Sequence, residues 1–218
     1  MFVGHYGPSF LVEWLKPGIP LWILFLAVQL LDVFWAVFVF FGVEAVRIVP
    51  GFTETNDLDL YYMPYTHSLP GALAWAVGSA ILYGSIARSK RGGALVAAAV
   101  FSHWPLDFLV HRPDLALYDN TAKVGLGWWD YPYLTLGLEG TLLLGAMALY
   151  MANSRPLTRR ARFSVPVFCF AILTMQAGML YAPPPPSDQA MAATALVAYA
   201  LLAGIIAWLE RGRATKAI

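Results

Sequence analysis

The sequence predicts an all-α fold: a polytopic membrane helix bundle of about six transmembrane helices, preceded by a short N-terminal amphipathic or re-entrant helix. Two observations predict this class. Of the 218 residues, 59% are hydrophobic and only 12% are charged, which is more apolar surface than a soluble domain of this size could bury. The apolar residues are also gathered in runs close to the length of about 20 residues that a membrane-crossing helix needs. Lipid is therefore the expected surroundings for most of the chain.

Six apolar runs are expected to cross the membrane, and together they form one transmembrane domain over residues 1–218. The runs are Pro20–Gly42, Leu69–Ala87, Gly93–Val110, Tyr131–Met151, Phe163–Tyr181 and Met191–Leu209.

The loops between the runs alternate in charge, and this alternation predicts an orientation. Basic clusters follow the second, fourth and sixth runs, whereas the remaining loops carry acidic residues and fewer basic ones. Because basic loops stay on the cytoplasmic side, both termini are expected to be cytoplasmic. The net charge of +1 leaves no basic face for nucleic acid, so a nucleic-acid partner is not expected. The basic residues of these clusters are Arg88, Lys90 and Arg91, then Arg155, Arg159, Arg160 and Arg162, then Arg211, Arg213 and Lys216.

A short helix is expected over residues 8–16, before the first full span. Pro17 and Pro20 stop it, because proline lacks a backbone donor. Such a segment either lies flat at the interface or dips into the bundle as a re-entrant arm. If it dips inward, His5 rises about 16 Å above Lys16 at 1.5 Å per residue.

Four ionisable residues lie inside spans that are otherwise apolar: Asp32, His103, Asp107 and Glu139. Each costs roughly 2.5–3.5 kcal/mol or more in lipid, so such residues normally face the bundle interior. Measured from the inner helix ends, all four rise to about 15–21 Å, which is also the height expected for His5. We therefore expect them to meet in one pocket.

The third span carries a stripe of candidate ligands. His103, Asp107 and His111 follow at intervals of four residues and project from one face of the helix. Pro105 is expected to free the carbonyl of Phe101 and to kink the helix beside the site. Imidazole mixed with carboxylate is a ligand set typical of zinc, manganese or iron. For His111, a hydrogen bond between helices is the favoured interpretation.

A fourth imidazole, His67, precedes the second span, where Ser68 is a candidate N-cap and Pro70 suits the first helical turn. Structural alternatives stay open: His103 and Asp107 could pair with each other, and Glu139 could hydrogen-bond a backbone or hydroxyl group between helices. All four histidines precede the fourth span. The site is therefore assigned to residues 1–151, and residues 163–209 are interpreted as two supporting helices.

Taken in order, several of these residues resemble the bacterial inner-membrane proteins grouped as membrane-bound metal-dependent hydrolases, the YdjM-like family. The resemblance covers roughly the first half of the chain. The residues that carry it are Gly4–His5, Leu30–Leu31–Asp32, Thr66–His67–Ser68 and Ser102–His103 followed by Asp107. It implies location in the bacterial inner (cytoplasmic) membrane and a metal site formed by His5, Asp32, His67, His103 and Asp107.

The family usually has a Pro-Asp-x-Asp motif and a His-Arg pair, where this chain has one aspartate and Met63–Pro64–Tyr65. This difference favours one ion over two.

The leading hypothesis is a membrane-embedded metal-dependent hydrolase that binds one divalent ion, zinc or manganese. Glu139 or Glu44 would act as general base, and the substrate would be a lipid or lipid-linked phosphate or ester entering from the bilayer. Two alternatives stay open. Intramembrane acids and histidines also suit a proton-coupled transporter or permease, although no repeat relates two halves of the chain. A structural accessory subunit without catalysis is the third hypothesis.

Overall fold

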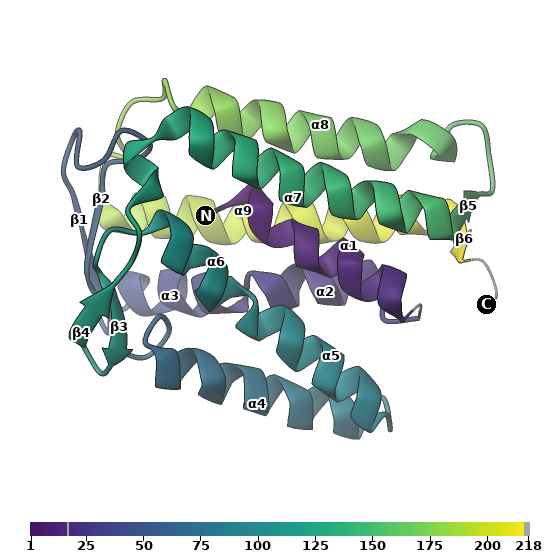
Figure 1. Ribbon diagram of the computed structural model, residues 1–218, viewed down its shortest axis with the longest axis horizontal. Helices are drawn as coiled ribbons and strands as arrows, with labels where there is room; N and C mark the ends of the chain where they lie inside the picture. The colour runs from purple at the N-terminus through teal and green to yellow at the C-terminus, as the bar shows by residue number, and fades with distance from the viewer. Residues whose placement is uncertain (17, 216–218) are drawn as a thin grey trace.

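A computed structural model describes residues 1–16 and 18–215 and is mostly helical (Figure 1). Five helices are long and apolar enough to cross a membrane, or six if one bent pair counts as a single span. This agrees with the predicted helix bundle. The five are α4 (Leu69–Ile86), the α5–α6 segment (Lys90–Val110), α7 (Pro132–Asn153), α8 (Ala161–Met179) and α9 (Asp188–Glu210).

The outer faces of these helices are apolar and exposed. On α4, for example, Val77, Ile81 and Ile86 are more than half exposed, and on α9 Trp208 is 69% exposed. Outward-facing apolar side chains on long helices are stable where lipid surrounds them. The pattern therefore indicates a membrane protein.

The first predicted span is bent rather than continuous. It consists of α2 (Leu21–Val28) and α3 (Leu30–Phe40), which meet at 56° around Gln29. The third span is interrupted once: a single residue, Ser102, separates α5 (Lys90–Phe101) from α6 (His103–Val110). Pro105 cannot donate to the Phe101 carbonyl, so the end of α5 at Phe101 lies where the proline was expected to break the helix.

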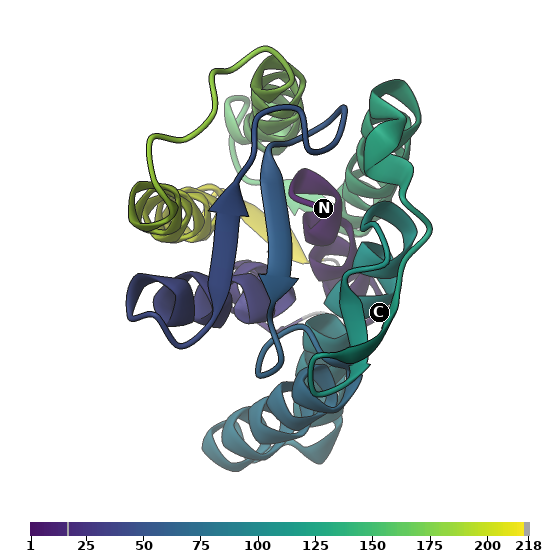
Figure 2. The ribbon, with the colours of Figure 1, turned by 90° about the vertical axis from the view of Figure 1, so that its left-hand side faces the viewer.

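The N-terminal segment packs inside the bundle, which is the arrangement that the re-entrant alternative predicts; we call it the re-entrant arm. A 3₁₀ turn (η1, Val3–His5) leads into α1 (Tyr6–Leu15), which packs against α7 and α2 inside the bundle. Figure 2 shows the arm surrounded by the other helices. Glycine permits this approach, since a Cβ on Gly7 would lie 2.8 Å from the backbone oxygen of Leu142 in α7.

Three short antiparallel strand pairs, which the all-α prediction did not include, join the helices. The β3–β4 pair turns through the two residues Asp119 and Asn120, and Asp119 has a positive φ of 50°. Asp and Asn tolerate that conformation, which two-residue hairpin turns require. The pairs are β1 (Ala45–Ile48) with β2 (Leu58–Tyr62), β3 (Leu115–Tyr118) with β4 (Thr121–Val124), and β5 (Ser154–Pro156) with β6 (Arg213–Thr215).

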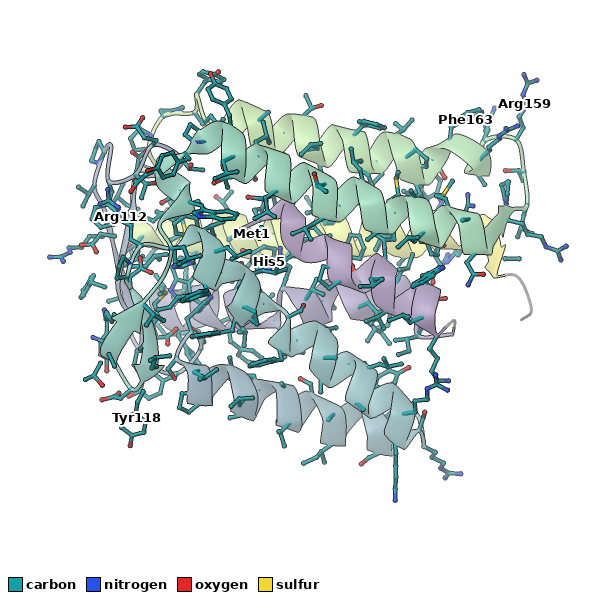
Figure 3. All side chains as sticks on the ribbon, in the orientation of Figure 1. Met1, His5, Arg112, Tyr118, Arg159 and Phe163 are labelled. Atoms are coloured by element: carbon teal, nitrogen blue, oxygen red, sulfur yellow. The ribbon has the colours of Figure 1, made fainter. Side chains whose placement is uncertain are left out.

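The two ends of the bundle differ. We call the end that carries β1–β2 and β3–β4 the hairpin end, and the end that carries the α4–α5 turn and β5–β6 the basic end (Figure 1). Arg159 lies at the basic end, opposite Arg112 at the hairpin end (Figure 3). Met1 lies within the bundle, between the two ends, whereas the C-terminal strand β6 lies at the basic end.

Candidate metal centre

All four histidines of the chain and two of its aspartates meet inside the bundle, around the start of the re-entrant arm, where Met1 and His5 lie (Figure 3). Five different segments bring them together, and all but Asp32 are less than 4% exposed. We call this set the His/Asp cluster: His5 on the arm, Asp32 on α3, His67 just before α4, His103 and Asp107 on α6, and His111 directly after α6.

Asp107 lies at the centre of the cluster. Its Oδ1 accepts from the α-amino group of Met1 at 2.8 Å and lies 3.0 Å from His5 Nε2. Its Oδ2 lies 3.0 Å from His103 Nε2, 3.6 Å from His111 Nε2 and 3.7 Å from His67 Nε2. One carboxylate therefore faces four imidazoles.

Asp32 joins the cluster from the opposite helix. Its Oδ1 lies 3.3 Å from His67 Nε2 and 3.4 Å from His103 Nε2. Its Oδ2 accepts a hydrogen bond from the hydroxyl of Tyr199, on α9, at 3.1 Å. The last helix therefore takes part in the site, in addition to the first four spans.

A chain of hydrogen bonds orients His67. The Thr66 hydroxyl donates to Glu44 Oε2 at 2.6 Å, so its oxygen accepts from His67 Nδ1, 2.8 Å away. The other oxygen of Glu44 accepts from the backbone amides of Tyr65 and Thr66. With its proton on Nδ1, neutral His67 presents a lone pair on Nε2 toward the two aspartates.

Two further imidazoles are oriented in the same way. His103 Nδ1 donates to the Val28 carbonyl at 2.7 Å, and Val28 is the residue at which α2 ends before the bend. His111 Nδ1 donates to Asp114 Oδ1 at 2.7 Å. Both rings therefore also turn an Nε2 lone pair inward. Protein ligands to metals commonly have this arrangement, in which a second hydrogen bond fixes the ring.

At the centre of the cluster, hydrogen-bond acceptors therefore face one another: imidazole nitrogens lie opposite carboxylate oxygens. Three Nε2 lone pairs point at Asp32 Oδ1 and Asp107 Oδ2, and a dry interior makes such unpaired groups expensive. Either extra protons or a cation must lie between them. Within the described residues, His103 Nε2 is buried with no hydrogen-bond partner.

The spacing of the acceptors suits a metal ion. Two sets of three ligand atoms lie within 4.8 Å of one another: His5, His103 and Asp107, and Asp32, His67 and His103. Ligands about 2.0–2.2 Å from a tetrahedral zinc ion lie about 3.3–3.6 Å apart. The 3.3 Å and 3.4 Å separations in the second set match that spacing. The buried His/Asp groups could hold a metal ion.

Glu139 and Glu44, the two predicted bases, lie in different surroundings. Both oxygens of Glu44 are occupied by the Tyr65–Thr66 segment described above. Glu139 Oε2 accepts from the backbone amides of Phe2 and Gly4, whereas its Oε1 is buried and lacks a hydrogen-bond partner among the described residues. Glu139 therefore has a free oxygen, and Glu44 does not.

A cavity of about 570 Å³ opens from the His/Asp cluster. Asp32, His67, Asp107, His111 and Glu139 line it at the cluster. Its walls include the hairpin-end halves of α8 and α9, the 182–186 segment that joins them, and the loop 53–58 between β1 and β2. A molecule bound in this cavity would therefore be able to contact both the candidate ligands and the free oxygen of Glu139.

No family model, curated protein or solved structure matches the chain. The interpretation of the site consequently depends on its geometry.

The structure brings together all five residues that the resemblance implied as ligands, His5, Asp32, His67, His103 and Asp107. His111, for which a structural hydrogen bond was favoured, makes that bond with Asp114 and also faces Asp107.

Sequence reasoning missed Tyr199 and the orienting role of Thr66. A tyrosine inside the apolar sixth run was the available signal for Tyr199, and Thr66 lies in the Thr66–His67–Ser68 motif itself. Ser68 caps α4 as predicted, accepting from the Gly71 amide.

Proposed function

We propose that this protein is a membrane-embedded metal-dependent hydrolase whose His/Asp cluster binds a divalent ion, zinc or manganese. The observation that carries the proposal is the set of inward-facing acceptors at the end of a cavity that also contains a free carboxyl group. A divalent ion bound there would lower the pKa of a water molecule and polarise the scissile group. Imidazole and carboxylate ligands in this mixture suit zinc and manganese better than calcium or magnesium.

Within this proposal Glu139 acts as the general base. Its Oε1 is free, it lines the cavity, and its other oxygen is held by the Phe2 and Gly4 amides, which fix the side chain. A carboxylate in that position takes a proton from the attacking water and returns it to the leaving group. Glu44 acts as a positioning residue, because it reaches the cluster only through Thr66 and His67.

The two alternatives have less support. A proton-coupled permease or an accessory subunit would explain buried acids and histidines, but neither requires three imidazoles that present Nε2 to the same two aspartates. The resemblance to membrane-bound metal-dependent hydrolases agrees with the leading proposal and supplies the inner membrane as the proposed location.

The test is hydrolysis of chromogenic p-nitrophenyl esters of increasing chain length by protein in lipid nanodiscs. We expect turnover that chelation removes and that zinc or manganese restores. Glu139→Gln should lower kcat by about 10²–10⁴-fold, the usual contribution of a general base, while metal content stays unchanged. Glu44→Gln should weaken metal binding and leave kcat at saturating metal close to wild type. Turnover that survives both chelation and Glu139→Gln would overturn the proposal.

A further inference from the structure

Side chains of α8 and α9 that line the cavity are also exposed on the outside of the bundle. Met175 and Met179, on α8, line the cavity and are 44% and 54% exposed. Met191 and Ala198 line it from α9. Because both helices are candidate membrane spans, an opening between these side chains would face lipid close to the hairpin-end limit of the spans.

Two loops line the cavity at its hairpin end: residues 53–58 and the 182–186 segment between α8 and α9. The loop 53–58 between β1 and β2 lines the cavity there, and the Thr55 hydroxyl donates to the Trp129 carbonyl at 2.5 Å. Trp129 belongs to η2 (Trp128–Asp130), so this bond ties the loop to the segment that precedes α7. Figure 2 shows the β1–β2 hairpin across this end of the bundle. The gap between α8 and α9 is therefore the entry that suits an apolar molecule.

The charged side chains that line the cavity are acidic. They include Glu54 and Asp57 in the loop, in addition to Asp32, Asp107 and Glu139 at the cluster. Among the described residues that line it, none is lysine or arginine, and the cation present is the Met1 amino group, which already donates to Asp107.

The nearby arginines are also paired elsewhere. Arg112 binds Asp130, and Arg47 binds Asp59. Phosphate groups are usually held by arginine forks or lysine, which this cavity does not offer. Away from the proposed metal ion, a phosphate would therefore meet several carboxylates.

The size of the cavity limits the substrate further. A volume of about 570 Å³ lies within the range of about 300–1,000 Å³ typical of sites for one drug-sized ligand. It accommodates a single apolar chain with a compact head better than a two-chain phospholipid.

We propose that the cavity takes an uncharged single-chain amphiphile, a neutral ester or amide, whose apolar chain lies between α8 and α9 and whose head reaches the His/Asp cluster. This inference rests on the proposed hydrolase function for its reaction, but it concerns binding. It excludes a lipid phosphate as the preferred substrate, although that was one expectation from the sequence.

The test is photoaffinity labelling in nanodiscs with two diazirine probes that carry the same acyl chain. One is a neutral monoacylglycerol, and the other is the corresponding lysophosphatidic acid. We expect the neutral probe to label α8 and α9 residues around Met179 and Ala198, and the phosphate probe to label them at least several-fold less. Ala198→Trp, which fills the cavity wall, should reduce the neutral labelling several-fold. Ala200→Trp, on the exposed face of the same helix, is the matched control and should leave it unchanged.

Thermal melting checks that both variants are folded. Equal labelling by the two probes, or labelling that is insensitive to Ala198→Trp in a folded protein, would overturn the inference. Labelling is measured on Glu139→Gln protein, so it does not depend on turnover, and it is measured with and without metal, so that the phosphate probe is also tested with the ion present. Selective neutral labelling without any ester hydrolysis would refute the proposed function alone. Metal-dependent hydrolysis together with equal labelling would refute this inference alone.

Discussion

Two buried polar groupings lie at different heights in this bundle, and they differ in how their hydrogen bonds are balanced. At the basic end, Arg213 donates to the Ser154 hydroxyl, the Ser154 carbonyl and the Ala161 carbonyl. Nearby, Glu210 accepts from the Leu21 amide and Glu13 from the Gly18 amide. Donors and acceptors are matched there.

The His/Asp cluster is not matched in this way. Its imidazoles use their Nδ1 protons on outer partners and turn acceptors toward two carboxylates. Balanced polar groups are typical of structural locks, whereas a surplus of converging acceptors needs a cation or extra protons. The comparison teaches that burial and charge alone do not mark a functional site, because both groupings have them. The surplus of acceptors is what distinguishes the cluster.

The largest expected effect on metal binding comes from replacing one of the surplus acceptors in the His/Asp cluster. Asp32→Asn replaces an acceptor that faces His67 and His103 with an amide that can donate to them. Loss of a direct ligand should weaken metal binding by more than the roughly 10–100-fold that loss of a supporting partner costs. In metal-free protein, the same change should leave the melting temperature unchanged or raise it. Isothermal titration and thermal melting check this, with the exposed Asp119→Asn as control; a large loss of stability without metal would contradict it.

At the basic end, a substitution is expected to lower stability and to leave metal affinity unchanged. Arg213→Ala leaves the acceptors on Ser154 and Ala161 without their donor, which should cost about 1–3 kcal/mol of stability. Metal affinity should not change, because the cluster lies far along the bundle. Melting temperature and metal titration measure the two effects, and the exposed Arg155→Ala is the control at the same end. A change in metal affinity would show that the two groupings are coupled.

Removing an orienting group tests how the cluster is held. Thr66→Val deletes the acceptor for His67 Nδ1 and should weaken metal binding by about 10–100-fold. Thr135 is an equally buried threonine whose hydroxyl bonds the Trp128 carbonyl. Thr135→Val should therefore leave metal affinity unchanged. If both variants bind metal equally well, the hydrogen bond does not orient His67 as described.

The re-entrant arm that carries His5 depends on close packing. Gly7→Ala places a Cβ 2.8 Å from the Leu142 backbone oxygen, and overpacking of this kind costs about 1–3 kcal/mol. Gly145→Ala on α7 has no neighbour within 4 Å of its added Cβ and should be neutral or slightly stabilising. Thermal melting compares the two. Equal stability of the variants would mean that the arm is not held by this contact.

The smallest expected effect is a pH dependence at the basic end. Burial raises the pKa of Glu13 from 4.5 to about 7; the Gly18 amide opposes this shift, and the charge of Glu210 adds to it. Between these two values the folded protein binds more protons than the unfolded one, so stability falls as pH rises. Glu13→Gln should flatten that slope in melts from pH 5 to 8, whereas the exposed Glu54→Gln should not. An unchanged slope in Glu13→Gln would contradict this assignment.

The sequence predicts the spans of the bundle well because hydropathy is a local property. The spans lie within a few residues of their expected limits, and the heights of Asp32, His103, Asp107 and Glu139 follow from helix rise alone. That these residues lie together is also foreseeable, since polar residues at one depth in lipid tend to face one another.

Other features depend on contacts that no local pattern encodes. The bend at Gln29 places the Val28 carbonyl against His103, 75 positions away. Tyr199 bonds Asp32 across 167 positions. Glu44 has both oxygens bound by Tyr65 and Thr66, which separates its role from that of Glu139 only once the fold is known.

The most direct test of the central claim is an anomalous difference map from crystals of protein purified with zinc and manganese present. Data collected on either side of each metal's absorption edge would identify the ion. We expect a peak among Asp32, His67, His103 and Asp107 that disappears in His103→Ala. A cluster without any peak in well-ordered wild-type crystals, together with no binding in solution, would contradict the claim that its surplus acceptors hold a metal ion.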